Sequence, residues 1–311
     1  MKLIQWSDSH ASTNNISATQ NVLNTADDIC IPIHCGDLVN QYFEGGISNT
    51  DLSKSLCVIG NHDAITKDGT IGSIYDWTKQ PTQSQLRARY IEPLIDSFNV
   101  VSEDSFTWWS KQINGFMLVG LNDTVINSAV ANTQAEWMHR VIAQCESSST
   151  PIVIIKHSAP IGEHLIECNF TSNTAKTRMT PEIEFYNDTY IHANDCINIA
   201  LNSNATVLCV LHGHGHYDSF GYLKKQDGTY VPSIGINSTL VDSYGDVSRS
   251  TDVNNAASVV LNQIEFDSNL NTMRIYRLGS DNSALGCYRK MIVYSYETNG
   301  IVSTCSNRGM N

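Results

Sequence analysis

The sequence predicts an α/β fold, and the order of its apolar segments is the first observation that indicates it. Short apolar runs of strand length recur at residues 2–6, 29–35, 55–60, 116–122, 151–157 and 206–212. Because these runs are apolar on both faces, they are typical of strands in a sheet that other layers cover. Stretches compatible with helices alternate with them, at residues 16–28, 83–97, 132–146 and 185–202. This alternation favours an α/β domain with largely parallel strand pairing.

Two of the expected helices carry residues that define their faces. The segment 132–146 has apolar residues about 3.6 positions apart, and Thr133 is a candidate N-cap. The segment 83–97 carries Arg87, Arg89 and Tyr90, which we expect on a helix surface, with substrate contact as the alternative.

The last third of the chain has an antiparallel pattern. Residues 220–236 hold an Asp-Gly turn between two β-type runs, and residues 258–279 repeat the hairpin pattern. No linker, repeat or low-complexity tract separates this part from the rest. We therefore expect a single domain over 1–311, in which 1–217 carries the polar strand ends described below and 218–311 is a β-rich part of a second sheet.

Composition narrows the class of protein. The chain has 311 residues and a formal net charge of −12, with 41% hydrophobic and 16% charged residues, which is typical of a globular protein. The negative charge argues against a nucleic-acid partner, because non-specific binding to nucleic acid depends on clustered Lys and Arg. It is compatible with phosphorylated substrates, since bound cations can invert the local field.

The cysteine pattern, the N-terminal residues and the lengths of the apolar runs all favour a soluble protein. The nine cysteines are scattered without a C-x-x-C pair, which favours buried reduced thiols. The N-terminus lacks the pattern of a signal peptide, and no apolar run reaches the roughly 18 residues that a membrane span needs. We expect a cytoplasmic or otherwise soluble protein with no membrane contact; the sequence does not specify its oligomeric state.

Polar residues with ligand atoms follow five of the expected strands. They are Asp8 and His10, Asp37, Asn61 with His62 and Asp63, His157, and finally His214 and His216. A single Asp or Asn at a strand end is usually a turn residue, but ligands of open α/β sheets bind where the carboxyl ends of strands meet. Oxygen and imidazole nitrogen suit Mn, Fe or Zn. When His62 and Asp63 are set aside, seven side chains with ligand atoms remain. Seven are too many for one ion, but they are enough for two ions if one carboxylate bridges the two.

Local spacing supports a shared site. In Asp8-x-His10 both side chains would point to the same side of an extended backbone. His214-x-His216 would do the same if extended, whereas a turn would aim the two rings at different ions. Gly36, Gly60 and Gly213 each precede one of these residues, where glycine permits a sharp exit from the strand and a close approach of the backbone. Two further histidines, His34 and His212, lie inside apolar runs, and we expect them in the protein interior.

The five blocks D-x-H, G-D, G-N-H-D, H and G-H-x-H, in this order over residues 8–216, resemble the calcineurin-like metallophosphoesterase superfamily. The resemblance implies a four-layer α/β/β/α sandwich, in which two packed β-sheets are flanked by helices and two divalent or trivalent ions (Mn, Fe or Zn) are bound. It implies that Asp8, His10 and His216 hold the first ion and that Asn61, His157 and His214 hold the second. Asp37 would bridge the two ions. His62 would act as the catalytic acid, with Asp63 orienting its ring.

The resemblance also implies an activity. It is hydrolysis of a phosphoester by in-line attack of a metal-bridging hydroxide, with His62 as acid. The segments "WSDSHAS" and "CGDLVNQ" lack the glycines and the arginine of the protein phosphatase branch, which favours a small phosphodiester or phosphomonoester such as a nucleotide. The alternative is a non-enzymatic assembly component, for example a phage-associated one, that retains the fold.

Overall fold

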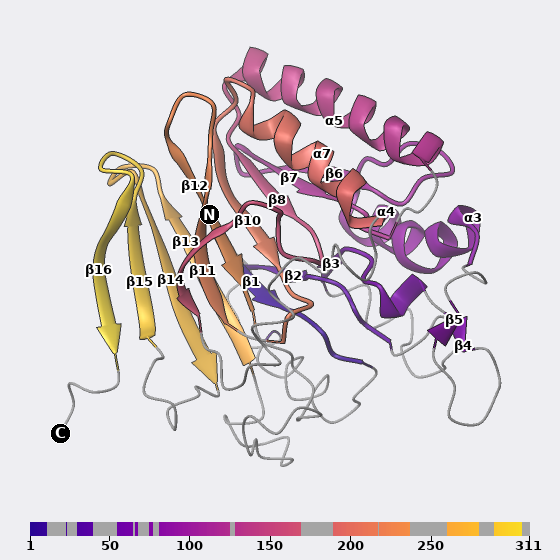
Figure 1. Cartoon of the computed structure of the whole chain (residues 1–311), viewed down its shortest axis with the longest axis horizontal. Coiled ribbons are helices and arrows are strands. Elements are labelled where there is room, and N and C mark those ends of the chain that lie inside the picture. Colours follow the sequence, from indigo (N-terminus) through magenta and orange to yellow (C-terminus); the bar gives the residue numbers. More distant parts are fainter. Residues whose placement is uncertain are drawn as a thin grey trace.

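The structure is a computed structural model of the whole chain (Figure 1). The residues it describes are 1–10, 23, 30–39, 55–64, 66–67, 75–76, 81–124, 128–168, 189–216, 218–236, 260–279 and 289–306.

Within the described residues, two mixed sheets of seven strands form the centre of the molecule. The first sheet has the spatial order β16 (Gly300–Ser306), β15 (Arg289–Ser295), β14 (Thr272–Gly279), β13 (Val260–Asp267), β1 (Lys2–Trp6), β2 (Cys30–His34) and β3 (Leu56–Cys57). The second has the order β6 (Trp109–Ile113), β7 (Phe116–Gly120), β8 (Ile152–Ile155), β10 (Val207–His212), β12 (Tyr230–Gly235), β11 (Ser219–Lys224) and β9 (His164–Cys168). A short ribbon pairs β4 (Thr66–Lys67) with β5 (Tyr75–Asp76).

The strands predicted from apolar runs pair in parallel, as expected. β1, β2 and β3 run parallel in the first sheet, and β7, β8 and β10 run parallel in the second. The remaining strands of the first sheet, β13 to β16, add to β1 in antiparallel fashion. Because parallel strands end at the same edge, the polar residues that follow them gather there.

The two sheets pack face to face around one apolar core. Leu3 and Ile33 of the first sheet belong to the same buried cluster as Val153 and Leu211 of the second. On the other face of the second sheet, α5 (Ser128–Ser148) and α7 (Thr189–Leu201) cover a second buried cluster (Figure 1). Each sheet therefore brings the ends of its parallel strands to one side of a packed sandwich.

The described strands of residues 218–311, a range expected to belong to a second sheet, divide between the two sheets. β11 and β12 form the predicted Asp-Gly hairpin and join the second sheet, whereas β13 to β16 extend the first. The hairpin pattern of residues 258–279 is confirmed by the pair β13–β14. The strands divide in this way because β13 pairs with β1, for example at Gln5↔Asn262, so β13 and the strands after it extend the first sheet.

The helices start and end close to the predicted segments. The segment 83–97 contains α3 (Gln83–Leu86), the π-helical turn η3 (Arg87–Ile91) and α4 (Glu92–Phe98). Of the expected helix 16–28, only Leu23 is among the described residues; it is helical and buried. None of the helices in the described ranges combines the length and apolar character needed to cross a membrane.

One cap was predicted wrongly. α5 begins at Ser128, so Thr133 lies inside the helix and does not cap it. Its hydroxyl donates to the carbonyl of Ala129 at 3.0 Å, four residues back. A Ser or Thr hydroxyl can accept a hydrogen bond from a backbone N–H at the start of a helix, or donate one to the carbonyl four residues back inside it. The spacing of apolar residues does not distinguish these two positions.

Candidate metal centre

The predicted ligands and the two predicted catalytic residues all lie at the strand ends on one side of the sandwich. Asp8, His10 and Asp37 follow β1 and β2, and Asn61 follows β3, just before the 3-10 turn η1 (His62–Ala64). His157, His214 and His216 follow β8 and β10 of the other sheet. Three groups bring ligand atoms within 4.8 Å of one another: Asp8–His10–His216, His10–Asp37–His62 and Asp37–His157–His214. The groups overlap at His10 and Asp37, so they form one continuous cluster.

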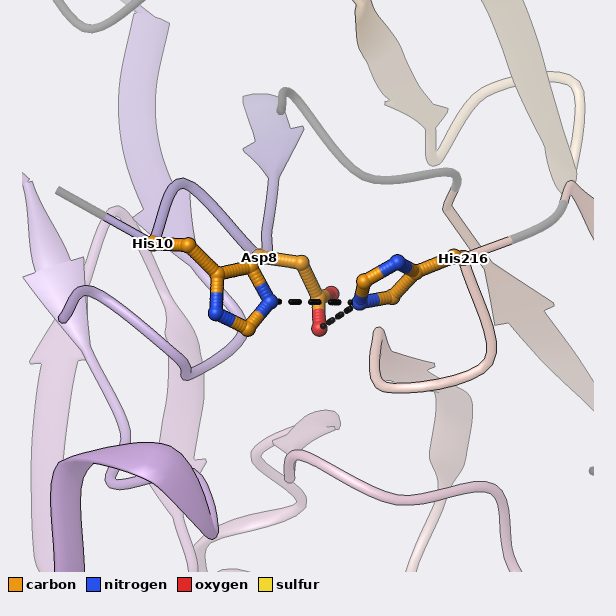
Figure 2. Close-up of side chains that lie close together, drawn as sticks. All are labelled: Asp8, His10 and His216. Carbon is orange, nitrogen blue, oxygen red and sulfur yellow. Dashed lines mark hydrogen bonds and ion pairs between the residues drawn. The ribbon is translucent and has the colours of Figure 1, made fainter. Parts of the chain in front are cut away.

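The first group joins the two sheets. Figure 2 shows Asp8 and His10, from one chain segment, facing His216 from another. The Nε2 atom of His216 lies 3.2 Å from Oδ1 of Asp8 and 3.2 Å from Nε2 of His10. The other carboxylate oxygen of Asp8 accepts a hydrogen bond from the backbone N–H of His214 at 2.9 Å. Asp8 thus fixes the segment that carries His216 while one oxygen faces the two imidazoles.

The third group is centred on His157, which is wholly buried. Its Nε2 atom lies 2.8 Å from Oδ1 of Asn61, 3.1 Å from Nδ1 of His214 and 3.3 Å from Oδ2 of Asp37. Its Nδ1 lies 2.7 Å from the carbonyl oxygen of Cys35, which accepts a hydrogen bond. A ring that donates from Nδ1 keeps Nε2 available as a ligand, which is the arrangement of metal-binding histidines.

The donor set fits a pair of cations. In two places, His10 with His216 and His157 with His214, imidazole nitrogens face each other at 3.2 and 3.1 Å. Two facing nitrogens share a single proton in a hydrogen bond, whereas a cation between them accepts both lone pairs. Carboxylate, amide oxygen and imidazole are ligands that Mn, Fe and Zn accept.

The backbone around the ligands is unusual. Five of the predicted ligands lie in the left-handed region: Asp8 (φ 53°), His10 (φ 45°), Asp37 (φ 57°), His214 (φ 63°) and His216 (φ 55°). Six other non-glycine residues in the described ranges, all outside the cluster, also have positive φ. Few non-glycine residues adopt positive φ, and such conformations cluster at functional sites. The prediction of an extended Asp8-x-His10 segment is therefore wrong: left-handed turns bring the side chains together. His214 and His216 follow the turn alternative and enter different groups.

Glycines allow the strand ends to approach one another. A Cβ atom on Gly60 would lie 2.2 Å from Oδ1 and 2.3 Å from the backbone nitrogen of Asp37. A Cβ atom on Gly213 would lie 1.8 Å from Oγ of Ser7 and 2.5 Å from Oδ2 of Asp8. Real Cβ atoms essentially never approach other atoms this closely, so a larger residue at either position would displace the neighbouring loop of the cluster.

The substitution Gly60→Ala is expected to destabilise the protein by about 1–3 kcal/mol, the usual cost of overpacking, and to weaken metal binding. The clash is with the backbone and carboxylate of Asp37, neither of which can move without displacing the cluster. Chemical unfolding and metal titration measure the two effects. Gly300→Ala is the matched control, because the nearest atom to its Cβ would be 3.9 Å away. Equal stability and metal affinity in the two variants would contradict this account of Gly60.

Asp63 connects two of the ligand-bearing loops. Its Oδ2 accepts the backbone N–H groups of Asp37 and Gly60, both at 2.9 Å, and its Oδ1 accepts that of Val39 at 3.0 Å. Burial and the nearby Asp37 carboxylate raise the pKa of Asp63 to about 7, although the backbone hydrogen bonds oppose this shift. Through these hydrogen bonds, the Asp63 carboxylate connects the loop after β2 to the loop after β3.

Tyr90 was predicted on a helix surface, and this prediction is wrong: the residue lies in the same region as Asp63. It is wholly buried, and its hydroxyl donates to Oδ1 of Asp63 at 3.4 Å. The pattern of residues 83–97 did not reveal this, because the π-helical turn at 87–91 alters the helical spacing. His34 and His212 are buried, as predicted.

Asp123, at the end of β7, is a residue whose role the sequence did not reveal. Its Oδ2 accepts the backbone N–H groups of His157 at 3.1 Å and Ser158 at 2.7 Å, and the hydroxyl of Ser158 at 2.6 Å. The ammonium of Lys156, itself buried, lies 3.7 Å away. Asp123 therefore fixes the loop that presents His157. Its position after a predicted strand is the signal that it shares with the other site residues.

His62 lies at the edge of the cluster. Its backbone N–H donates to Oδ1 of Asp37 at 2.8 Å, and its ring meets that of His10 edge to face at 4.6 Å between centroids. The side chain is half-buried, unlike the fully enclosed His157. His62 is thus held close to both groups while part of its ring remains accessible.

Electrostatics in the metal-free protein predict proton release on metal binding. Burial alone would lower the pKa of His157, but the adjacent Asp37 and Asp8 carboxylates outweigh it and raise the pKa to about 10. At neutral pH the ring is therefore protonated, and it must lose a proton before Nε2 can bind a cation. Apparent metal affinity is expected to rise with pH up to that value, by at most about tenfold per unit for one proton.

Isothermal titration calorimetry at neutral pH in buffers of different ionisation enthalpy measures this release. We expect about one proton to be released from His157 when metal binds to the wild-type protein. The His157→Gln protein should release one proton fewer on binding metal. Metal binding that is independent of pH between about 6 and 8 would contradict the assignment of His157 as a ligand.

No known family model matches this chain, and no curated protein matches it in sequence. A dimetal phosphatase from Danio rerio matches in structure over 90% of this chain and 96% of its own length, at a TM-score of 0.50 and 9% identity. A purple acid phosphatase from yellow lupin (Lupinus luteus) seeds matches over 96% of this chain at a TM-score of 0.52 and 12% identity, and 54% of that protein is covered. The chain therefore has the α/β sandwich fold of the metallophosphoesterases.

Proposed function

We propose that this chain is a metal-dependent hydrolase of phosphoester bonds that uses two ions. One observation carries the proposal: Oδ2 of Asp37 lies 3.8 Å from Nε2 of His10 and 3.3 Å from Nε2 of His157, so one carboxylate oxygen faces both ligand groups. A pair of closely spaced ions is the recurring arrangement in phosphatases and nucleases. The fold that the chain shares with a dimetal phosphatase and a purple acid phosphatase supports the same class of reaction.

The cluster divides into two sets of ligands with a shared member. The first ion would be held by Asp8, His10 and His216, the second by Asn61, His157 and His214, and both by Asp37. When bound, two such ions lower the pKa of a water molecule and withdraw charge from phosphate oxygens. The protein's own contribution is to hold these side chains in place through Asp63 and Asp123, which fix the backbone of the loops that carry them.

His62 would act on the substrate, with Asp63 next to it in the chain. A half-buried imidazole beside the cluster can donate a proton to the leaving oxygen as the ester bond breaks, or neutralise charge on the phosphate. Its backbone hydrogen bond to Asp37 holds the residue close to the place where the two metal ions would bind. Asp63 would orient the ring indirectly, through the loops that its carboxylate connects.

The substrate would be a small phosphodiester or phosphomonoester, such as a nucleotide. With a net charge of −12, the chain attracts phosphate chiefly where cations are bound, which favours a small ligand over a long polyanion. The ions would be Mn, Fe or Zn, according to the mixed nitrogen and oxygen ligands.

Hydrolysis assays test the proposal. The purified protein is loaded with Mn, Zn or Fe(II) and offered bis-p-nitrophenyl phosphate and p-nitrophenyl phosphate. We expect release of p-nitrophenol that a chelator abolishes and that added metal restores. A protein that binds two ions and hydrolyses neither these esters nor a panel of nucleotides would contradict the proposal and favour a non-enzymatic assembly role.

A further inference from the structure

The core between the two sheets contains a row of polar side chains at its metal-centre end. Gln5 lies opposite Asn262 on β13, and Asn262 lies opposite Arg277 on β14. All three are buried, and on the same face of the sheet their neighbours are apolar, for example Leu3 and Ile275. Buried polar groups are costly unless they are hydrogen-bonded, so a row of them in an apolar core calls for an explanation.

These side chains form a continuous chain of hydrogen bonds that runs from Asp218 to the backbone of His212 and Ile234. The guanidinium of Arg277 donates from Nη2 to Asp218 and from Nη1 to Oδ1 of Asn262, the latter at 3.2 Å. The amide of Asn262 donates to Oε1 of Gln5 at 3.2 Å. The amide of Gln5 donates in turn to the backbone carbonyls of His212 and Ile234, both at 3.0 Å. We call the four residues Asp218, Arg277, Asn262 and Gln5 the polar clamp.

The polar clamp holds the segment that carries His214 and His216 at both of its ends. Gln5 bonds the carbonyl of His212, two residues before His214, and Arg277 pairs with Asp218, two residues after His216. Gln5 itself lies three residues before Asp8, on the strand that leads to the Asp8–His10 segment. The polar clamp therefore connects the strand before Asp8 and His10 to both ends of the segment that carries His214 and His216.

We propose that Arg277 is a positioning residue for the first ion site, acting through Asp218 and the Gln5 chain on His216 and Asp8. The inference rests on the proposed metal-dependent function and concerns the geometry of the first ligand group. An arginine remains charged, and its planar fork can bond two acceptors at fixed angles, here Asp218 and Asn262. Its buried charge therefore fixes Asp218, because an unpaired charge in the core would be strongly unfavourable.

The test compares Arg277→Met with Arg274→Met on the same strand. Arg274 is half-exposed and pairs with Asp267 at 3.7 Å, so it controls for loss of an arginine from β14. Mn²⁺ titration followed by electron paramagnetic resonance distinguishes a spin-coupled ion pair from a single ion. We expect the wild-type protein and Arg274→Met to show the coupled pair. Arg277→Met should keep the second ion and bind the first about 10- to 100-fold more weakly, the usual effect of losing a group that orients ligands.

Two further variants keep the test decisive if Arg277→Met does not fold. Asp218→Asn removes the charge pair from the loop side, and Arg277→Lys retains a charge but cannot bond two acceptors in a fork. Both should weaken the first ion selectively, with Arg277→Lys the milder. Wild-type Mn²⁺ affinity and spin coupling in a folded Arg277 or Asp218 variant would overturn the inference.

The same measurement separates this inference from the proposed function. A coupled pair that is present in the wild type and lost in Arg277→Met supports the positioning role even if no phosphoester is hydrolysed. A wild-type protein that binds none of Mn²⁺, Zn²⁺ and Fe²⁺ overturns both.

Discussion

Asp37→Ala is expected to abolish tight binding of both ions and to reduce phosphoester hydrolysis by roughly 10³-fold or more, since metal ions supply several kcal/mol of transition-state stabilisation. The reason is its position between the groups: its Oδ2 faces His10 and His157, and its Oδ1 holds the backbone of His62. Metal analysis after desalting and steady-state kinetics measure the two losses.

Two variants accompany this experiment. Asp37→Asn keeps an oxygen in place but removes the charge, and we expect an intermediate loss of metal affinity. Asp104→Ala, on an exposed turn, controls for loss of an aspartate and should behave as the wild type. A fully metallated Asp37→Ala protein would contradict the bridging role.

His62→Ala is expected to retain both ions and to lose about 10²- to 10⁴-fold in kcat, the range typical of general acid catalysis. The side chain is half-buried at the edge of the cluster, and its backbone, which contacts Asp37, is unchanged by the substitution. His139→Ala on the exposed face of α5 is the matched control and should have no effect.

The leaving group distinguishes the two roles of His62. If the ring donates a proton, the loss in kcat should be larger for phenyl esters than for p-nitrophenyl esters, because a poorer leaving group depends more on protonation. An equal loss for both esters would indicate neutralisation of phosphate charge. Unchanged turnover of both esters would remove His62 from the mechanism.

The sequence predicted the features of this fold that local pattern determines. The central strands are buried on both faces, so β8 and β10 read as continuous apolar runs and were placed correctly. Nine polar residues that follow five of the predicted strands were expected to meet because parallel strands end at one edge. The structure brings together seven of them as potential ligands and places Asn61 and Asp63 in contact with these. The division of the hairpins between two sheets depends on long-range pairing of β1 with β13, which no local pattern contains.

The remaining features of the candidate site depend on tertiary contacts. The left-handed turns at Asp8 and His10 form because the folded cluster compensates their strain. Asp and His adopt this region more often than most non-glycine residues, but positive φ is still uncommon for them, so the sequence alone did not predict these turns. Asp123 and Arg277 act through partners 34 and 59 residues away, His157 and Asp218. The neighbouring sequence does not show which distant group each of them contacts; for Asp123 it offers only the position after a predicted strand.

Anomalous scattering from crystals of the protein grown with Mn²⁺ locates the bound ions themselves. We expect two peaks roughly 3.5–4 Å apart, one beside Asp8, His10 and His216 and the other beside Asn61, His157 and His214, with the Asp37 carboxylate between them. A single peak, or none at these side chains in crystals of the folded protein, would contradict this expectation.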